Sequence, residues 1–203
     1  RRQRQMCIRD SIEIVREFGV SPVVALNVFP TDYPDEIDAV RKVAEAAGAH
    51  FASSTHVVDG GDGAVDLARA VVAACEQKTA FRYTYDLEDS LVEKLTKVAT
   101  KVYGADGIDI APAAAKELAH FEDLGYGTFP VVIAKTHLSL SHDPSLKGAP
   151  TGWRLPVREV RAAVGAGYIY AICGDMRTMP GLGRHPAAER IDIDDSGETI
   201  GLF

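Results

Sequence analysis

The residues best suited to chemistry in the second half of the chain directly follow the apolar run at residues 129–134. They are Lys135, Thr136 and His137. A lysine in this place can bind a phosphate or a carboxylate, while the adjoining backbone lines a base pocket. The alternative is a lysine at a strand end whose ammonium reaches solvent. His137 and His142 lack the H-E-x-x-H spacing of a metal site. We therefore predict a nucleotide site or another ligand pocket here, and no metal ligand.

Phe29 is a second candidate, because it ends the apolar run at residues 23–28. That run is rich in β-branched residues, which is typical of a strand buried on both faces of a parallel sheet. Ligands of open α/β sheets bind outside the carboxyl ends of the strands, where the next residues, Pro30, Thr31 and Asp32, emerge. An aromatic ring there would meet a ligand. The alternative is a core residue that closes the end of the strand.

The glycine-rich residues 59–63 come just before an apolar helical pattern that begins at Ala64. Backbone N–H groups at the start of a helix, with its partial positive charge, can bind an anion, although such glycines also occur in plain turns. The phosphate-binding sequence G-x-x-x-x-G-K-[ST] does not occur in the printed sequence, and no Ser–His–Asp or Cys–His spacing singles out a nucleophile. No catalytic residue is therefore predicted in this segment.

Alternating strands and helices would position these candidates. Apolar spacing predicts helices at residues 10–18 and 34–48, and a strand at 49–53 completes a right-handed βαβ unit. Further along we expect a loop at 54–63, helices at 64–75, 86–102 and 112–124, an extended linker at 81–85, strands at 108–110, 129–134 and 168–173, a long loop at 135–153, a loop-like tail at 174–190 and a hairpin at 191–203. Residues 155–164 fit either a strand or a helix. The predicted class is α/β, with a mostly parallel sheet flanked by helices and a C-terminal β-hairpin.

Composition limits the class of protein. The 203 residues carry a formal net charge of −7, which argues against a nucleic-acid partner because such proteins are usually basic. No apolar stretch approaches the roughly 20 residues that a membrane span needs, so no membrane partner is expected. The three cysteines form no C-x-x-C pair. A reducing, cytoplasmic setting is therefore expected, without a zinc site or a disulfide framework. The basic residues 1–10 have no apolar segment after them, so they are no secretory signal, and we interpret them as an N-terminal junction.

Four motifs occur in a characteristic order: PVVALNVFPTD, GGDGAVDLA, VVIAKTHLSLSHDP with KGAPTGW, and GDMRTMPGLGRHPAAERIDIDDSGETIGLF. Together, over residues 11–203, they resemble the C-terminal part of formate–tetrahydrofolate ligase (formyltetrahydrofolate synthetase); residues 1–10 do not match. The resemblance implies an enzyme that uses ATP to join formate to tetrahydrofolate through formyl phosphate, giving 10-formyltetrahydrofolate. It also implies ATP with Mg²⁺, a supporting monovalent cation, and a homotetramer of longer chains. The family's P-loop lies upstream of these residues, so the segment alone is not expected to turn over.

The resemblance also implies site residues. In the family, the phenylalanine of N-x-F-P-T-D is one side of an aromatic clamp on the pterin ring, and that position is Phe29. The other side is a tryptophan just before the glycine loop, where this chain has Val57 next to His56. The implied folate contacts are Phe29, Pro30, Thr31, His56, Val57, Gly60 and Gly61. In the A-K-T-Q motif, Lys135 and Thr136 are retained and His137 replaces the glutamine. This segment and the tail loop around Met176 and Met179 are expected near the folate and nucleotide pocket.

The missing clamp tryptophan leaves a second function open. The chain would then be a non-catalytic folate-binding or assembly domain of the same descent. An unrelated Rossmann-like nucleotide-binding domain is disfavoured, because no G-x-G-x-x-G follows the first strand.

Overall fold

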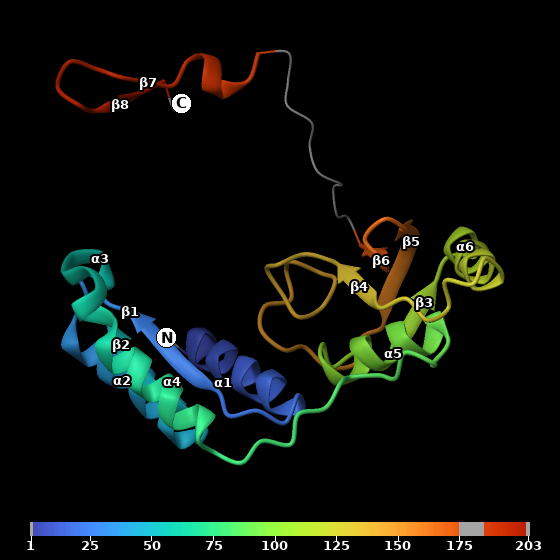
Figure 1. Ribbon diagram of the computed structural model, residues 1–203, viewed down its shortest axis with the longest axis horizontal. Coiled ribbons are helices and arrows are strands. Elements are labelled where there is room, and N and C mark those ends of the chain that lie inside the picture. Colours follow the sequence, from blue (N-terminus) through green and yellow to red (C-terminus); the bar gives the residue numbers. More distant parts are fainter. Residues whose placement is uncertain (1, 175–184, 202–203) are drawn as a thin grey trace.

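Strands and helices alternate along the chain in the computed structural model, which describes residues 2–174 and 185–201 (Figure 1). The helices are α1 (Arg2–Glu17), α2 (Pro34–Ala46), α3 (His56–Asp59), α4 (Val65–Cys75), α5 (Leu91–Lys101) and α6 (Pro112–Asp123), with 3₁₀ helices η1 (Gly60–Ala64) and η2 (Ala187–Glu189). The strands are β1 (Val23–Asn27), β2 (His50–Ser54), β3 (Ile108–Ile110), β4 (Val131–Ala134), β5 (Leu155–Ala163), β6 (Tyr168–Cys173), β7 (Asp192–Ile193) and β8 (Thr199–Ile200).

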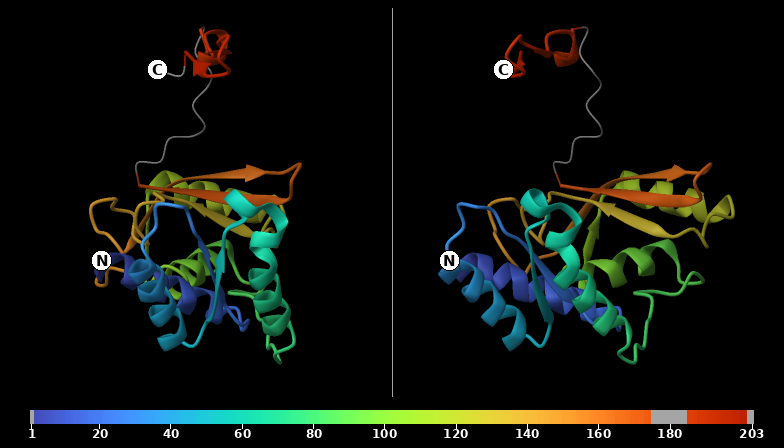
Figure 2. Two further views of the ribbon diagram at one scale, coloured as in Figure 1. Left: turned by 90° about the vertical axis from the view of Figure 1, so that its left-hand side faces the viewer. Right: turned by 60° about the vertical axis from the view of Figure 1, so that its left-hand side comes forward.

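The N-terminal part of the fold is the predicted βαβ unit. β1 and β2 pair in parallel, from Val23 opposite His50 to Asn27 opposite Ser54. Ile12 of α1 and Ala44 of α2 are buried together, with Val24 and Phe51 packed against them. The two-stranded sheet lies between α2 on this face and α4 on the other (Figure 2).

One expectation for β1 is wrong. The apolar sequence predicted a strand buried on both faces, yet no residue of β1 is fully buried, and Ala25 and Asn27 are exposed. The cause is topological, because β1 pairs with β2 on one side and no other described strand pairs with it.

The next part of the chain forms a separate sheet with the strand order β3-β5-β6-β4 among the described residues. β3 pairs with β5 and β4 with β6 in parallel, whereas β5 and β6 form an antiparallel hairpin. The described sheets are thus mostly parallel, as predicted, and residues 155–163 are a strand rather than a helix. The main core lies between this sheet and helices α5 and α6; its fully buried members include Leu91, Leu95, Leu155, Val157, Ile169 and Cys173.

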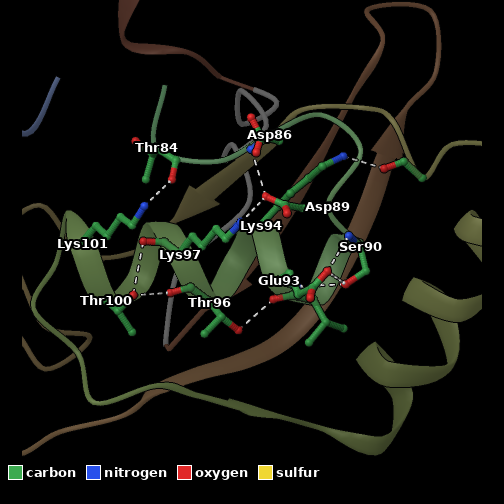
Figure 3. A network of polar contacts seen from close by, with 12 residues as sticks. Thr84, Asp86, Asp89, Ser90, Glu93, Lys94, Thr96, Lys97, Thr100 and Lys101 are labelled. Atoms are coloured by element: carbon green, nitrogen blue, oxygen red, sulfur yellow. Dashed lines mark hydrogen bonds and ion pairs between the residues drawn. The ribbon is translucent and has the colours of Figure 1, made fainter. Parts of the chain in front are cut away.

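Helix α5 begins at Leu91, five residues later than the predicted start at Asp86. Residues 86–89 instead form a turn, in which the backbone N–H of Asp86 donates to Asp89 Oδ2 at 2.9 Å. Ser90 then caps the helix: its Oγ accepts from the Glu93 N–H at 3.3 Å, and Glu93 Oε2 accepts from the Ser90 N–H at 2.9 Å (Figure 3). This reciprocal cap satisfies two of the backbone N–H groups that the start of a helix leaves without an intrahelical partner.

Lys94 is the largest side chain that is completely buried among the described residues, and it extends from α5 toward the start of β4. Its ammonium donates to the carbonyl oxygens of Gly127 at 2.5 Å and Phe129 at 3.1 Å. Burial lowers the pKa of Lys94 below its usual value. The lysine therefore ties the segment that enters β4 to α5, because a buried ammonium is stable only when its donors are satisfied.

Two further segments differ from expectation. The first helix begins at Arg2 rather than Asp10, so residues 2–10 continue the helix that the apolar spacing indicated only from residue 10. The expected loop at 54–63 contains α3 and η1, because local turns close it with hydrogen bonds from Val58 and Asp59 to the carbonyl of Thr55.

The predicted C-terminal hairpin is confirmed as β7 and β8, which pair antiparallel. Met176, Met179 and the TMPGL part of the tail motif lie outside the described residues. Residues 135–154 contain neither helix nor strand, in agreement with the expected long loop. Among the described residues, no helix combines the length and apolar character needed to cross a membrane.

Candidate ligand site at the strand ends

Phe29 follows β1 in a tight turn that is closed by hydrogen bonds between Phe29 and Asp32. The N–H of Phe29 donates to Asp32 Oδ2 at 2.9 Å, and the N–H of Asp32 donates back to the Phe29 carbonyl at 3.0 Å. The Phe29 side chain is 46% exposed. Within the described chain Phe29 is thus not the core residue that was the alternative, and its ring is open to a ligand.

His56 holds the corresponding place after β2. Ser54, the last residue of β2 and 1% exposed, has its Oγ 2.9 Å from His56 Nδ1. This hydrogen bond restrains the exposed imidazole, and it leaves Nε2 available for a ligand.

The loop after His56 is closed by Gly63, the last of the glycine-rich residues 59–63. The N–H of Thr55 donates to the Gly63 carbonyl at 3.0 Å. A Cβ at Gly63 would lie 2.7 Å from the Thr55 carbonyl carbon and 2.8 Å from the His56 nitrogen. Only glycine therefore fits there without shifting the Thr55–His56 peptide. At Gly61, in contrast, a Cβ would meet nothing within 4 Å; at Gly60 the space is also open, but the φ of +60° favours glycine.

Parallel pairing brings the two loops to one edge of the sheet. The N–H of Val28 donates to the Ser54 carbonyl at 2.9 Å, so the ladder between the strands continues to the point where both chains leave the sheet. Phe29, Pro30 and Thr31 therefore follow one strand and His56 and Val57 its neighbour, at the carboxyl ends where α/β sheets bind ligands. Val57 is 56% exposed, and no aromatic ring occupies its position.

Lys135 lies in a second place, directly after β4. Its Nζ donates to the Thr136 carbonyl at 3.1 Å and to the Ser139 carbonyl, and it stands 4.7 Å from the centre of the Tyr103 ring. Burial lowers the pKa of Lys135. The lysine thus organises its own loop instead of simply reaching solvent, and part of its donor capacity is already used.

Lys135, Thr136 and His137 line one pocket of about 260 Å³, together with Asp10 and Ser11 of α1. Asp10 Oδ2 is buried without a hydrogen-bond partner, and burial raises the pKa of this carboxyl group. Phe29 and His56 are not among the residues that line this pocket. The structure therefore gathers the predicted residues into two groups: one at the ends of β1 and β2, and one after β4.

Metal ligands are not gathered in the described part of the chain, where no group of three His, Cys, Asp or Glu side chains could hold an ion. The described residues therefore gather no all-protein ligand set for Mg²⁺, and we assign them no metal chemistry.

Three residues that support the site had no individual role assigned from the sequence: Asp32, Ser54 and Gly63. Each acts on a neighbour at most eight residues away, by hydrogen bonding to Phe29 or His56 or by giving room to the Thr55–His56 peptide. No local signal pointed to Ser54, because β2 has the sequence HFASS and residue 54 belonged to the loop expected at 54–63.

The fold and these loops define the described chain as an α/β segment with a candidate ligand site at the carboxyl ends of parallel strands. The sequence model of the family described as formate–tetrahydrofolate ligase matches residues 5–203. The chain belongs to this family. The match begins inside residues 1–10, which the motifs had left outside the resemblance.

Known relatives agree with the family. The chain is 94% identical over 196 residues to the formate–tetrahydrofolate ligase of Cutibacterium acnes (strain DSM 16379 / KPA171202), covering 97% of this chain and 35% of the relative. It is 60% identical over 195 residues to the formate–tetrahydrofolate ligase of Saccharopolyspora erythraea, covering 96% of this chain and 34% of the relative. The chain thus spans about a third of the length of the relatives it matches.

Proposed function

We propose that this chain is the C-terminal part of an ATP-dependent ligase that joins formate to tetrahydrofolate through formyl phosphate, and that it supplies one wall of the folate site. The observation that carries the proposal is the exposed Phe29 ring at the carboxyl end of β1, where the Asp32 carboxylate holds the Phe29 backbone in a turn. A flat pterin binds well to an exposed aromatic face, because stacking buries apolar area on both partners.

His56 is assigned to the same site. Its ring is restrained by Ser54, and its Nε2 can exchange hydrogen bonds with the polar edge of a pterin. Pro30, Thr31, Val57, Gly60 and Gly61 border the site through their places in the two loops. Val57 offers an apolar contact of smaller area than an aromatic ring.

ATP and Mg²⁺ are assigned mainly to the part of a full-length ligase that this chain does not span. The printed sequence has no phosphate-binding P-loop, and the described residues do not gather metal ligands. The pocket around Lys135, Thr136 and His137 is proposed to accept an anionic part of the nucleotide or of the folate, since a lysine favours phosphate or carboxylate. The full-length enzyme is proposed to be a cytoplasmic homo-oligomer that a monovalent cation supports.

A non-catalytic folate-binding or assembly domain is the second candidate. The observation that favours it is Val57, an exposed aliphatic side chain at the place where the family resemblance implies a clamp tryptophan. A one-sided aromatic contact gives less binding energy than two stacked faces.

Calorimetry and turnover on matched proteins separate these functions. The printed chain and a full-length ligase containing it are titrated with tetrahydrofolate, and both are assayed for formate-dependent ADP release. We expect weak binding without turnover for the printed chain, and both binding and turnover for the full-length enzyme. Folate binding without turnover by the full-length enzyme would establish the second candidate. If neither protein binds tetrahydrofolate, the ligase proposal is wrong and the result favours an assembly domain.

A further inference from the structure

The outer edge of β1 has no partner strand within the described chain. The Pro22 carbonyl accepts from the His50 N–H at 3.1 Å, and the Val28 N–H donates to the Ser54 carbonyl at 2.9 Å. Peptide groups along a strand point alternately to its two sides. Those of the even-numbered residues therefore face β2, whereas those of Val23, Ala25 and Asn27 face away from it.

This open edge conflicts with the sequence of β1. A parallel sheet is normally buried on both faces, and its strands are near-continuous apolar runs such as this one. Two strands alone form only a marginal sheet. Ala25 is nevertheless exposed in the middle of β1, opposite the buried Ala52 of β2. The residue types of β1 suit a central strand, and its described surroundings are those of an edge strand.

The right-handedness of βαβ crossovers determines on which side of β1 a further strand would lie. α1 and α2 lie on the same face of the sheet, because Ile12 and Ala44 pack together over Val24 and Phe51. The crossover through α2 leads from β1 to β2. A parallel crossover is almost always right-handed. A right-handed crossover that enters β1 through α1, on the same face, must therefore start from a strand on the opposite side of β1.

The direction of α1 agrees with such a crossover. Figures 1 and 2 show its first turn near the end of β1 that leads to α2, so the helix runs back along the strand that it precedes. The helix of a βαβ unit has this direction, because it returns the chain from the carboxyl end of one strand to the start of the next.

We propose that the free edge of β1 binds a parallel apolar strand that directly precedes α1 in the full-length ligase, which gives the order new strand-β1-β2. The matched relatives have the length for it, since this chain covers only 35% of the first of them. A second copy of this chain is the competing occupant. It would pair β1 with β1 antiparallel about a two-fold axis and leave the crossover through α1 without its first strand.

The added strand has a consequence for the ligand site that rests on the proposed function. Its carboxyl end connects to the first turn of α1, and carboxyl ends of parallel strands meet at one edge. The connecting loop thus lies on the side of Phe29 away from His56. The folate site of the printed chain is therefore open at that side and closed in the full-length enzyme.

Residue-resolved hydrogen exchange on the printed chain and on a full-length ligase containing it tests the strand. We expect the amides of Ala25 and Asn27 to exchange about 100-fold more slowly in the full-length protein, because pairing protects them. The amides of Val24 and Leu26, which face β2, are the internal reference. No folate is present, so this result is independent of the proposed function.

Each outcome decides. Slow exchange of Ala25 and Asn27 in the full-length protein, at the level of Val24 and Leu26 and unchanged on dilution, supports the strand even if the printed chain alone proves too unstable to protect any amide. Slow exchange that is lost on dilution overturns it in favour of a second copy. Fast exchange of Ala25 and Asn27 in the full-length protein overturns it. Protection of both amides in the printed chain, together with a dimer mass by light scattering, also overturns it in favour of a second copy.

Discussion

The Oγ atom of Ser54 lies 2.9 Å from Nδ1 of His56, so the buried last residue of β2 holds the imidazole that opens the following loop. We predict that Ser54→Ala in a full-length ligase raises the KM for tetrahydrofolate about 3- to 10-fold with a smaller change in kcat, the range expected for one hydrogen bond. Ser54→Thr, which keeps the hydroxyl, should restore part of the loss. Ser53→Ala is the control, because its side chain points to the other face of the sheet. An unchanged KM in Ser54→Ala would remove His56 from the folate site.

Phe29 is expected to contribute mainly to binding rather than to stability. Phe29→Ala should raise the KM for tetrahydrofolate about tenfold, since an aromatic contact is worth on the order of 1 kcal/mol beyond its buried area. Steady-state kinetics of the full-length enzyme measure this change. Phe81, which is 56% exposed, provides a matched control as Phe81→Ala. Equal folate kinetics for the two variants would show that Phe29 does not contact the pterin.

Lys94 is expected to stabilise the fold. Lys94→Met keeps most of the side-chain volume but leaves the Gly127 and Phe129 carbonyls without their donor. The expected loss is about 2–4 kcal/mol in the free energy of unfolding, because two buried acceptors lose their hydrogen bonds. Urea denaturation measures it. Lys116→Met, at an exposed position of α6, should change the free energy by less than about 0.5 kcal/mol. A loss that small for Lys94→Met would contradict the assigned role.

The Ser90 cap predicts a pH dependence of stability. Hydrogen bonds from the backbone N–H and the hydroxyl of Ser90 hold the pKa of Glu93 below its ordinary value of 4.5. A carboxylate whose pKa is lower in the folded state stabilises the fold above its ordinary pKa, and it loses this contribution as the pH falls through the folded value. The difference in urea midpoint between the wild type and Glu93→Gln should therefore be largest near pH 7 and shrink below pH 4.5. A difference independent of pH would mean that the charge of Glu93 does not contribute.

The three cysteines should differ in reactivity. Burial raises the pKa of Cys173 to about 12, although the nearby Lys135 opposes the shift, whereas Cys7 and Cys75 are exposed. Since the thiolate is the reacting form, a disulfide reagent at pH 8 should label Cys7 and Cys75 rapidly and Cys173 only in denaturant. Peptide mapping of the labelled protein identifies the sites. Rapid native labelling of Cys173 would show that the end of β6 opens readily.

The sequence by itself determined the class of fold and most of its elements. Local information was sufficient where one pattern dominates: β1, α2, α6 and the C-terminal hairpin lie close to where apolar period, proline and turn residues put them. The family also followed from short motifs that survive in order along the chain. The predicted start of α5 was wrong because two local structures compete at Asp86–Ser90. The chain forms a turn there, and the helix begins only after the Ser90 cap.

Only the tertiary structure decided which residues meet. Parallel pairing placed the loops after β1 and β2 at one edge. The Lys135 group lines a different pocket, because it follows β4, which belongs to another sheet. The buried role of Lys94 and the support of His56 by Ser54 and Gly63 arise from contacts that no single-residue pattern encodes. Neither the sequence nor the structure of this chain explains the exposed β1 by itself. A strand is buried by neighbouring strands and helices, and we propose that one neighbour of β1 belongs to the longer chain.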